Sequence, residues 1–192
     1  KIFFKEKKVN YFKVNLLEKE KLKEIFHNQQ IDAVMHFAAV IDVNESIIDP
    51  SLYYRNNVIG SLNILDLMVE YNTKYFIFSS TAAVYGNSKH DVISEDHIKN
   101  PISPYGNSKS IVEEILSHYQ KAFNIRFSIL RYFNACGAHT DGTIGECHDP
   151  ETHLIPLILQ VASGRRRSLE VFGNNFNTID GTCVRDYIHV MD

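Results

Sequence analysis

Several kinds of residue are scarce in this 192-residue chain, and each shortage disfavours a class of protein. Its three cysteines form no C-x-x-C pair and no even framework, which argues against a disulfide-stapled secreted domain and predicts free thiols in a reducing cytoplasm. Basic residues are not in surplus, since the formal charge is -3, so no nucleic-acid partner is expected. The longest nearly apolar run, residues 33–41, is far shorter than the ~20 residues that cross a bilayer, so no membrane partner is expected either.

The composition is ordinary for a globular protein, and the apolar patterns alternate between those of strands and helices. Short apolar runs predict strands at Val9–Leu16, Ile31–Ala39, Tyr75–Ser80 and Arg126–Phe133. Longer periodic stretches predict helices at Glu18–Gln29, Ser51–Tyr71 and Tyr105–Phe123. This alternation predicts an α/β fold built on a doubly wound parallel sheet with helices on both faces. Ligands of such sheets bind beyond the carboxyl ends of the strands.

Small residues follow three of the predicted strands. The loops read AAVID at residues 38–42, SSTAAVYG at 79–86 and NACGAH at 134–139. Small residues at strand ends let a ligand approach the backbone, although a tight strand-to-helix turn favours the same residues. Three such loops together favour a shared ligand crevice.

Tyr105 and Lys109 stand four residues apart at the start of a predicted helix, and therefore on one face of it. A tyrosine has a pKa near ~10, and bringing that pKa to about 7 requires roughly 4 kcal/mol of preferential phenolate stabilisation. A lysine ammonium one turn away could supply part of this. Thr81, at the end of the preceding strand, could orient a substrate hydroxyl toward the phenol. The three residues predict a catalytic triad. In it, Thr81 orients the substrate, Tyr105 acts as general base, and Lys109 stabilises the phenolate.

Five stretches carry a resemblance to a known family: HFAA at residues 36–39, FSSTAAVYG at 78–86, SPYGNSK at 103–109, LRYFNACGAH at 130–139 and DGTCVRDYIHV at 180–190. Together they resemble the UDP-glucose 4-epimerases, a group within the extended short-chain dehydrogenase/reductase family. The resemblance runs over essentially the whole chain. The Y-x-x-x-K pair is shared across that family, whereas the pairing of the last two stretches is more specific to the epimerases.

The resemblance implies a Rossmann-like domain that keeps NAD bound while UDP-glucose and UDP-galactose interconvert through a 4-keto sugar. It implies catalytic roles for Thr81, Tyr105 and Lys109. The implied cofactor-binding residues are Asn15, Leu16, Phe37, Ala38, Ala39, Val40, Ile41, Asn56, Thr81, Tyr105, Lys109 and Phe133. The implied substrate-binding residues are Thr81, Tyr105, Asn134, His153, Glu170, Val171, Phe172 and Arg185. Of these, Glu170–Phe172 belong to an expected strand at Leu169–Phe172, and Arg185 suits a diphosphate, with an ion pair to a neighbouring aspartate as its structural alternative.

Three of these positions depart from the family pattern. Ile41 stands where many members carry lysine, and Asn15 stands where an acid is expected to contact adenine. His153 replaces an asparagine that contacts substrate. The first two departures put cofactor contacts in question.

The segment 139–153 also holds Asp141, Glu146, Cys147, His148 and Glu151. These residue types can bind metals, but they lack paired ligand spacing. The sequence therefore predicts a polar substrate loop and no metal site.

The glycine-rich turn of the family is missing, because none of the nine glycines forms a G-x-x-G-x-x-G pattern. We therefore expect an internal fragment that lacks the first two strands of the sheet. Residues 1–134 would be a partial NAD-binding domain, and residues 135–192 would begin an interleaved UDP-sugar-binding region. The complete enzyme is expected to be a homodimer, and the fragment alone is expected to be inactive.

Two alternatives remain open. A sugar-nucleotide 4,6-dehydratase or a related epimerase would share the triad, but elimination of water needs an acid beside Thr81, where Ala82 and Ala83 follow instead. A non-catalytic dinucleotide-binding regulator, or an inactive truncated product, would explain the missing glycine turn but not a retained triad.

Overall fold

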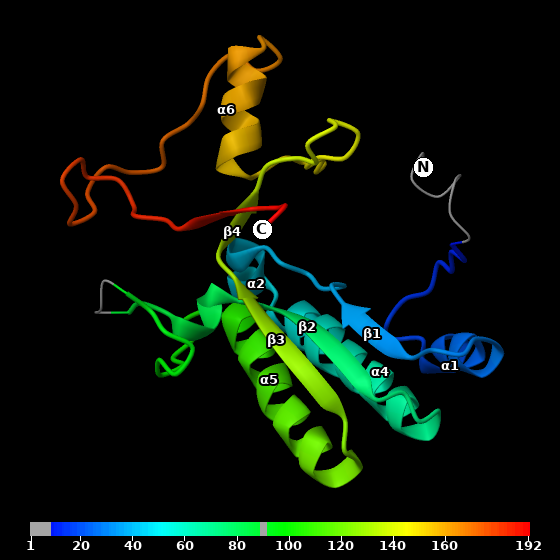
Figure 1. Ribbon diagram of the computed structural model, residues 1–192. Helices are drawn as coiled ribbons and strands as arrows, with labels where there is room; N and C mark the ends of the chain where they lie inside the picture. The colour runs from blue at the N-terminus through cyan, green and yellow to red at the C-terminus, as the bar shows by residue number, and fades with distance from the viewer. Residues whose placement is uncertain (1–8, 89–91) are drawn as a thin grey trace. The chain divides into compact units, whose positions relative to one another are not determined.

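The computed structural model describes residues 9–88 and 92–192 (Figure 1). The chain divides after Arg131 into two compact units, Lys1–Arg131 and Tyr132–Asp192. Within the described ranges, no helix combines the length and apolar character needed to cross a membrane. The functional division expected after residue 134 stays a prediction.

The larger unit is built on a three-stranded sheet in the order β1-β2-β3, formed by Ala33–His36, Tyr75–Thr81 and Arg126–Tyr132. Strands β1 and β2 run parallel, with Ala33 opposite Tyr75 and His36 opposite Phe78. Helices connect consecutive strands, as the alternating sequence pattern predicts. The α/β fold class is thereby confirmed.

Helices α4 (Gly60–Glu70) and α5 (Pro104–Phe123) lie side by side on one face of this sheet (Figure 1), and α1 (Lys19–Asn28) packs against α4. The predicted helices at Glu18–Gln29 and Tyr105–Phe123 are thus confirmed to within a residue or two. Their apolar stripes meet alternate side chains of β2 in one hydrophobic core. The fully buried members of that core include Leu65, Leu67, Met68, Phe76, Phe78, Val112 and Leu116.

The helix predicted at Ser51–Tyr71 has three consecutive parts. It begins as α3 (Pro50–Tyr53), continues as a π-helical turn (Tyr54–Ile59) and ends as α4. The Gly60 amide donates to the carbonyl of Arg55, five residues back, which is the π-type bond. Two short helices were not anticipated: α2 (Val43–Ile48), capped by Asp42, and a 3-10 turn (Ala82–Tyr85) directly after β2.

Two predicted strands are absent from the described residues. Val9–Leu16 and Leu169–Phe172 both lie in irregular backbone. Each has the alternating pattern of a strand, but no described segment pairs with it, and an extended segment is not a strand without a hydrogen-bonded neighbour.

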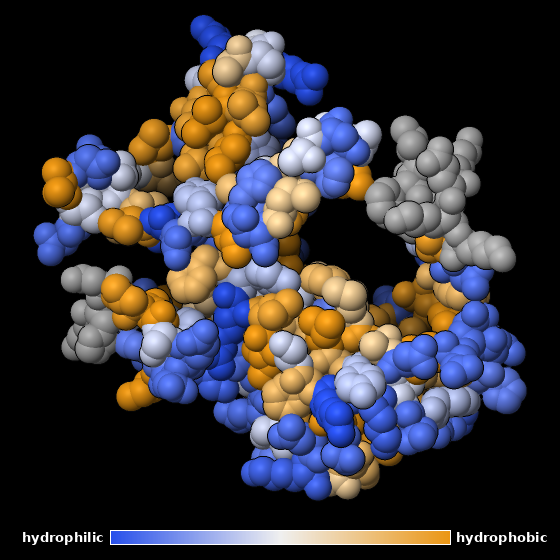
Figure 2. All heavy atoms as spheres, viewed as in Figure 1, coloured by the Kyte–Doolittle hydropathy of each residue, from blue (hydrophilic) through white to orange (hydrophobic). Residues whose placement is uncertain are grey.

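The smaller unit contains α6 (Leu154–Ala162) and a parallel pair formed by β4 (Asn134–Cys136) and β5 (Tyr187–His189). Helix α6 buries none of its residues. Figure 2 shows the apolar side chains gathered over this helix, where Leu154, Ile158 and Leu159 are exposed.

Candidate active site

Tyr105 is placed by the way helix α5 begins. Ser103 caps the helix, and its Oγ accepts a hydrogen bond from the Gly106 amide at 3.1 Å. Pro104 occupies the first helical position, where its fixed φ suits the helix and its missing N–H is not needed. The first turn of α5, which carries Tyr105, is therefore set by local sequence.

The same turn packs tightly against the end of β2. A Cβ placed on Gly106 would lie 2.6 Å from the carbonyl oxygen of Ala83, in the 3-10 turn. Thr81 caps that turn by accepting from the Ala83 amide at 3.2 Å. The absence of a side chain at Gly106 thus lets the helix approach closely enough to bring Tyr105 to Thr81.

Tyr105 lies partly buried, with its phenol near the side chain of Thr81. Burial raises the pKa of the Tyr105 phenol above its ordinary value of 10, and the interaction with Thr81 opposes that rise without cancelling it. The expected lowering of the Tyr105 pKa by Lys109 is therefore not seen, and the phenol of the protein alone is protonated at neutral pH.

Lys109 is 3% exposed and points along the sheet. Its Nζ donates to the carbonyl of Ser79 at 2.8 Å and lies 5.0 Å from the centre of the Phe78 ring. Burial lowers its pKa to about 8, so this ammonium is poorly hydrated and only marginally charged in mildly alkaline solution. The stem of the side chain carries the ammonium to the backbone of β2, at the carbonyl of Ser79.

Asn57 joins three parts of the site and was not anticipated from the sequence. Its side-chain amide donates to the Val40 carbonyl and accepts from the Val40 amide, both at 3.0 Å, and it also donates to Ser108 Oγ at 3.0 Å. Ser108 in turn donates to the Tyr105 carbonyl at 2.7 Å. This chain of bonds ties the loop after β1 to the helix that carries Tyr105. An asparagine at a core-facing helical position was the available signal.

Other predicted cofactor residues lie around this chain of bonds. Phe37, Ala38 and Ile41 are exposed on the loop after β1, and Asn56 donates to Asn57 Oδ1 at 3.2 Å. Leu16 lies at the far end of the π-helical turn, where its carbonyl accepts from Asn63 at 2.9 Å. Asn15 bonds locally, accepting from the Leu17 amide at 2.9 Å.

Beneath the site, Glu113 forms a second buried network. Its carboxylate accepts from Ser80 at 2.6 Å, from Arg131 at 2.8 and 3.0 Å, and from Lys99 at 3.2 Å. Burial alone would raise the pKa of Glu113, but the hydrogen bonds from Arg131 and Ser80 outweigh burial and lower it. Because Ser80 precedes Thr81, this network holds the strand end that presents Thr81. Glu113 follows Lys109 by four residues, so it lies on the same helix face as Tyr105 and Lys109. That spacing was the signal in the sequence that could have identified it.

The remaining predicted residues belong to the smaller unit. Phe133, Glu170, Val171, Phe172 and Arg185 are exposed there. The Asn134 side chain donates to the Asp186 carbonyl at 2.6 Å, and His153 occupies the N-cap position of α6 without a side-chain capping bond. Their substrate-binding roles stay predictions.

Comparison with known proteins matches residues 3–192 to the family described as NAD dependent epimerase/dehydratase. A UDP-glucose 4-epimerase of Rhizobium leguminosarum bv. trifolii is 47% identical over 178 residues, which cover 93% of this chain and 54% of the relative. One of Drosophila melanogaster is 45% identical over 190 residues, which cover 97% of this chain and 54% of the relative. The chain thus spans about half the length of the curated relatives it matches.

Solved structures agree in fold. UDP-glucose 4-epimerase from Bifidobacterium longum, in complex with NAD+ and UDP, superposes with a TM-score of 0.91 at 38% identity, covering 96% of this chain and 56% of that one. The Brucella ovis enzyme, in complex with NAD, gives a TM-score of 0.89 at 47% identity, covering 95% of this chain and 56% of that one.

Proposed function

The chain belongs to the NAD dependent epimerase/dehydratase family, and we propose that it carries the catalytic triad of an enzyme that interconverts UDP-glucose and UDP-galactose. The observation that carries the proposal is the close approach of α5 to the end of β2, which brings Tyr105 near Thr81, one turn of helix before the buried Lys109. These are the groups that proton transfer from a sugar hydroxyl requires.

The residues fit a dinucleotide cofactor. Lys109 Nζ has three N–H donors, and within the described ranges only the Ser79 carbonyl accepts from it. Two donors are therefore left for ribose hydroxyls. The loop Phe37–Ile41 and Asn56 would line the same site, with Val40 held in place by Asn57. NAD, when bound, would supply reversible hydride transfer at the sugar C4.

In the proposed reaction, Thr81 orients the C4 hydroxyl by hydrogen bonding and Tyr105 takes its proton. Because burial raises the pKa of Tyr105, the phenol acts as a base only when additional positive charge lies nearby. Lys109 is an ionisable group of the same site that can carry positive charge. Burial lowers its own pKa to about 8. Arg185 and Asn134 would hold the UDP group, which anchors the substrate while the keto sugar turns.

The neighbouring reaction class is disfavoured by the turn after β2. A 4,6-dehydratase needs an acid beside Thr81, whereas Ala82 and Ala83 occupy that turn. The homodimer, the cytoplasmic location and the UDP-sugar role of residues 135–192 are further parts of this proposal, and they rest on the family resemblance.

Substitution of Tyr105 tests the proposal. In the full-length protein, Tyr105→Phe should lower kcat for UDP-galactose formation by at least ~100-fold, the scale of a lost general base, with UDP affinity unchanged by calorimetry. Tyr119→Phe is the matched control, because Tyr119 lies on the same helix and donates to Asp66 at 2.6 Å, away from Thr81. Epimerisation by Tyr105→Phe at the rate of the control would show that Tyr105 is not the base.

A further inference from the structure

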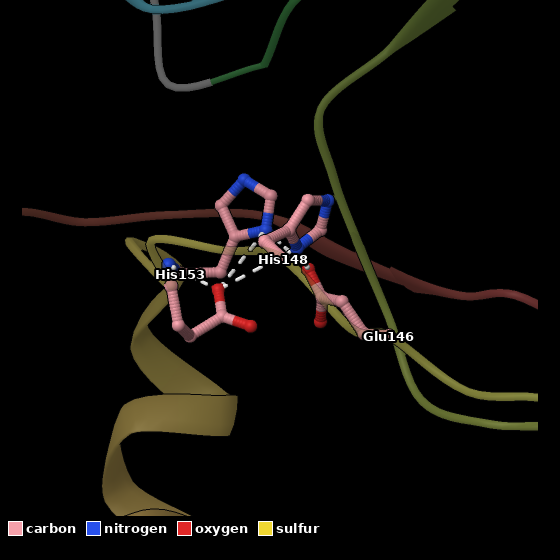
Figure 3. Close-up of side chains that lie close together, drawn as sticks. Glu146, His148 and His153 are labelled. Atoms are coloured by element: carbon pink, nitrogen blue, oxygen red, sulfur yellow. Dashed lines mark hydrogen bonds and ion pairs between the residues drawn. The ribbon is translucent and has the colours of Figure 1, made fainter.

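Four side chains in the smaller unit converge just before α6. Glu146, His148, Glu151 and His153 each direct one ligand atom into a common space, and these atoms all lie within 4.8 Å of one another. Figure 3 shows one nitrogen of each imidazole turned toward the carboxylates. The proposed epimerase chemistry uses none of these groups except His153.

The separations within the cluster suit a four-coordinate ion. His148 Nδ1 lies 3.6 Å from Glu146 Oε1 and 3.5 Å from Glu151 Oε1, and His153 Nδ1 lies 3.9 Å from Glu151 Oε1. Ligand bonds of ~2.0–2.2 Å to Zn2+ require tetrahedral edges of about 3.3–3.6 Å. A fourth pair, His153 and Glu146, is in direct contact and would have to separate slightly to accept an ion. The two rings stand edge to face with centres 4.7 Å apart, so both Nδ1 atoms can face one point.

The two carboxylates are shielded from solvent, and one of them is held by backbone amides. The side chains of Glu151 and Glu146 are only 7% and 18% exposed. Glu151 Oε1 accepts from the backbone amides of Thr152 and His153, both at 2.9 Å. A cation between these two shielded carboxylates, whose ligand oxygens lie within 4.8 Å of each other, would be stabilised by both.

We propose that Glu146, His148, Glu151 and His153 bind one divalent transition-metal cation, with Zn2+ as the best-suited ion. Two imidazole nitrogens disfavour Mg2+ and Ca2+, which prefer oxygen ligands, whereas imidazole with carboxylate suits Zn2+. The ion would fasten the loop to the first turn of α6. Ligation through Nδ1 leaves Nε2 of His153 available to a UDP-sugar, so the site is independent of the proposed epimerase function.

The ligand spacing in residues 139–153 predicted no metal site. The arrangement of side chains does not test that prediction. The alternative to a metal is a cluster held by protonated histidines. The two are separated by direct binding measurements on the full-length protein after treatment with a chelator.

In those measurements, Zn2+ should bind at one ion per chain by calorimetry, in the presence of excess Mg2+. His148→Ala should weaken Zn2+ binding by at least ~100-fold, beyond the ~10–100-fold that outer-shell changes cost. His139→Ala is the matched control, because His139 pairs with Asp141 at 2.8 Å in the same segment but outside the cluster. The control should bind Zn2+ as the unsubstituted protein does.

A second measurement needs no variant. Co2+ in place of Zn2+ should give the strong visible absorption of a tetrahedral ion, and Zn2+ should abolish it. Failure of the unsubstituted protein to bind Zn2+, a weak octahedral Co2+ spectrum, or equal affinities of His148→Ala and His139→Ala would each overturn the proposal. These readouts do not depend on epimerase activity, so the two proposals can fail separately.

Discussion

Replacing Glu113 by glutamine removes the negative charge from the network beneath Thr81 while keeping the size of the side chain. Glu113 is 4% exposed, and its carboxylate faces two cations, Arg131 and Lys99. Arg131 donates a hydrogen bond to each of its oxygens, at 3.0 and 2.8 Å. The substitution leaves the guanidinium partly buried, 19% exposed, without its counter-ion. We therefore expect loss of a buried ion pair and not merely of a hydrogen bond.

The magnitude follows from the burial of the pair. Breaking one partner of a buried ion pair costs ~3–5 kcal/mol, and we expect about 3 kcal/mol because an amide still accepts part of the hydrogen bonding. For a chain of this size, this corresponds to a Tm lower by roughly 6–12 °C. Glu70→Gln is the matched control, because Glu70 pairs with Lys23 at 2.6 Å where both side chains are more than 40% exposed. Because both partners are exposed to solvent, this ion pair should contribute little to stability.

The assay is urea unfolding as a function of pH. The pKa of Glu113 is lowered in the folded protein from an ordinary 4.5, so its stabilisation should be full above pH 4.5 and should decline as pH falls further. The stability difference between the unsubstituted protein and Glu113→Gln should follow the same course. Equal effects of Glu113→Gln and Glu70→Gln at neutral pH would refute the role assigned to the network.

Three further substitutions test other parts of the site. Burial lowers the pKa of Lys109 from 10.5 to about 8. In urea unfolding, the unsubstituted protein should therefore become more stable as pH rises from 8 to 10.5, whereas Lys109→Met should not. A flat stability profile in both proteins would contradict the burial of the ammonium. Asn57→Ala should cost about 3 kcal/mol in the same assay, because the amide and carbonyl of Val40 lose their partner; a loss below ~1 kcal/mol would show that water replaces it. Gly106→Ala should lower Tm despite the roughly 1 kcal/mol better helix propensity of alanine, because its Cβ would lie 2.6 Å from the Ala83 carbonyl; a raised Tm would show that the helix shifts freely.

The elements that position the triad could be predicted because their signals are local. The apolar runs at β1, β2 and β3, and the start of α5 at Ser103 and Pro104, follow from periodicity and capping. The pattern at Val9–Leu16 was equally strand-like, yet it forms no strand in the structure. Alternation predicts which side chains share a face, but a strand also needs a partner, and no local pattern supplies one.

The direction of the Lys109 side chain could not be predicted from the sequence. The spacing of Tyr105 and Lys109 places both on one helix face, but it does not say where a four-carbon stem carries the ammonium. That direction depends on the Ser79 carbonyl, 30 residues away in the chain. The same is true of Asn57, whose partner Ser108 is 51 residues distant. Interactions between segments so far apart depend on the tertiary fold, which periodicity does not encode.

The π-helical turn at Tyr54–Ile59 joins α3 to α4, and the number of residues in it affects the geometry of the site. A π-type turn accommodates one residue more than an α-turn, so α3 and α4 are out of phase by one position, or about 100° of rotation. Tyr53, fully buried with its ring edge-on to Tyr105, lies on one side of this offset, and the core residues of α4 lie on the other. Deletion of a single residue within the turn would let the backbone close as a uniform α-helix. It would also swing Tyr53 by about a quarter turn away from Tyr105, or else rotate the apolar stripe of α4 out of the core. A change in the number of residues in this turn therefore disturbs both the site and the core, whereas a substitution disturbs only the contacts of the residue that is replaced.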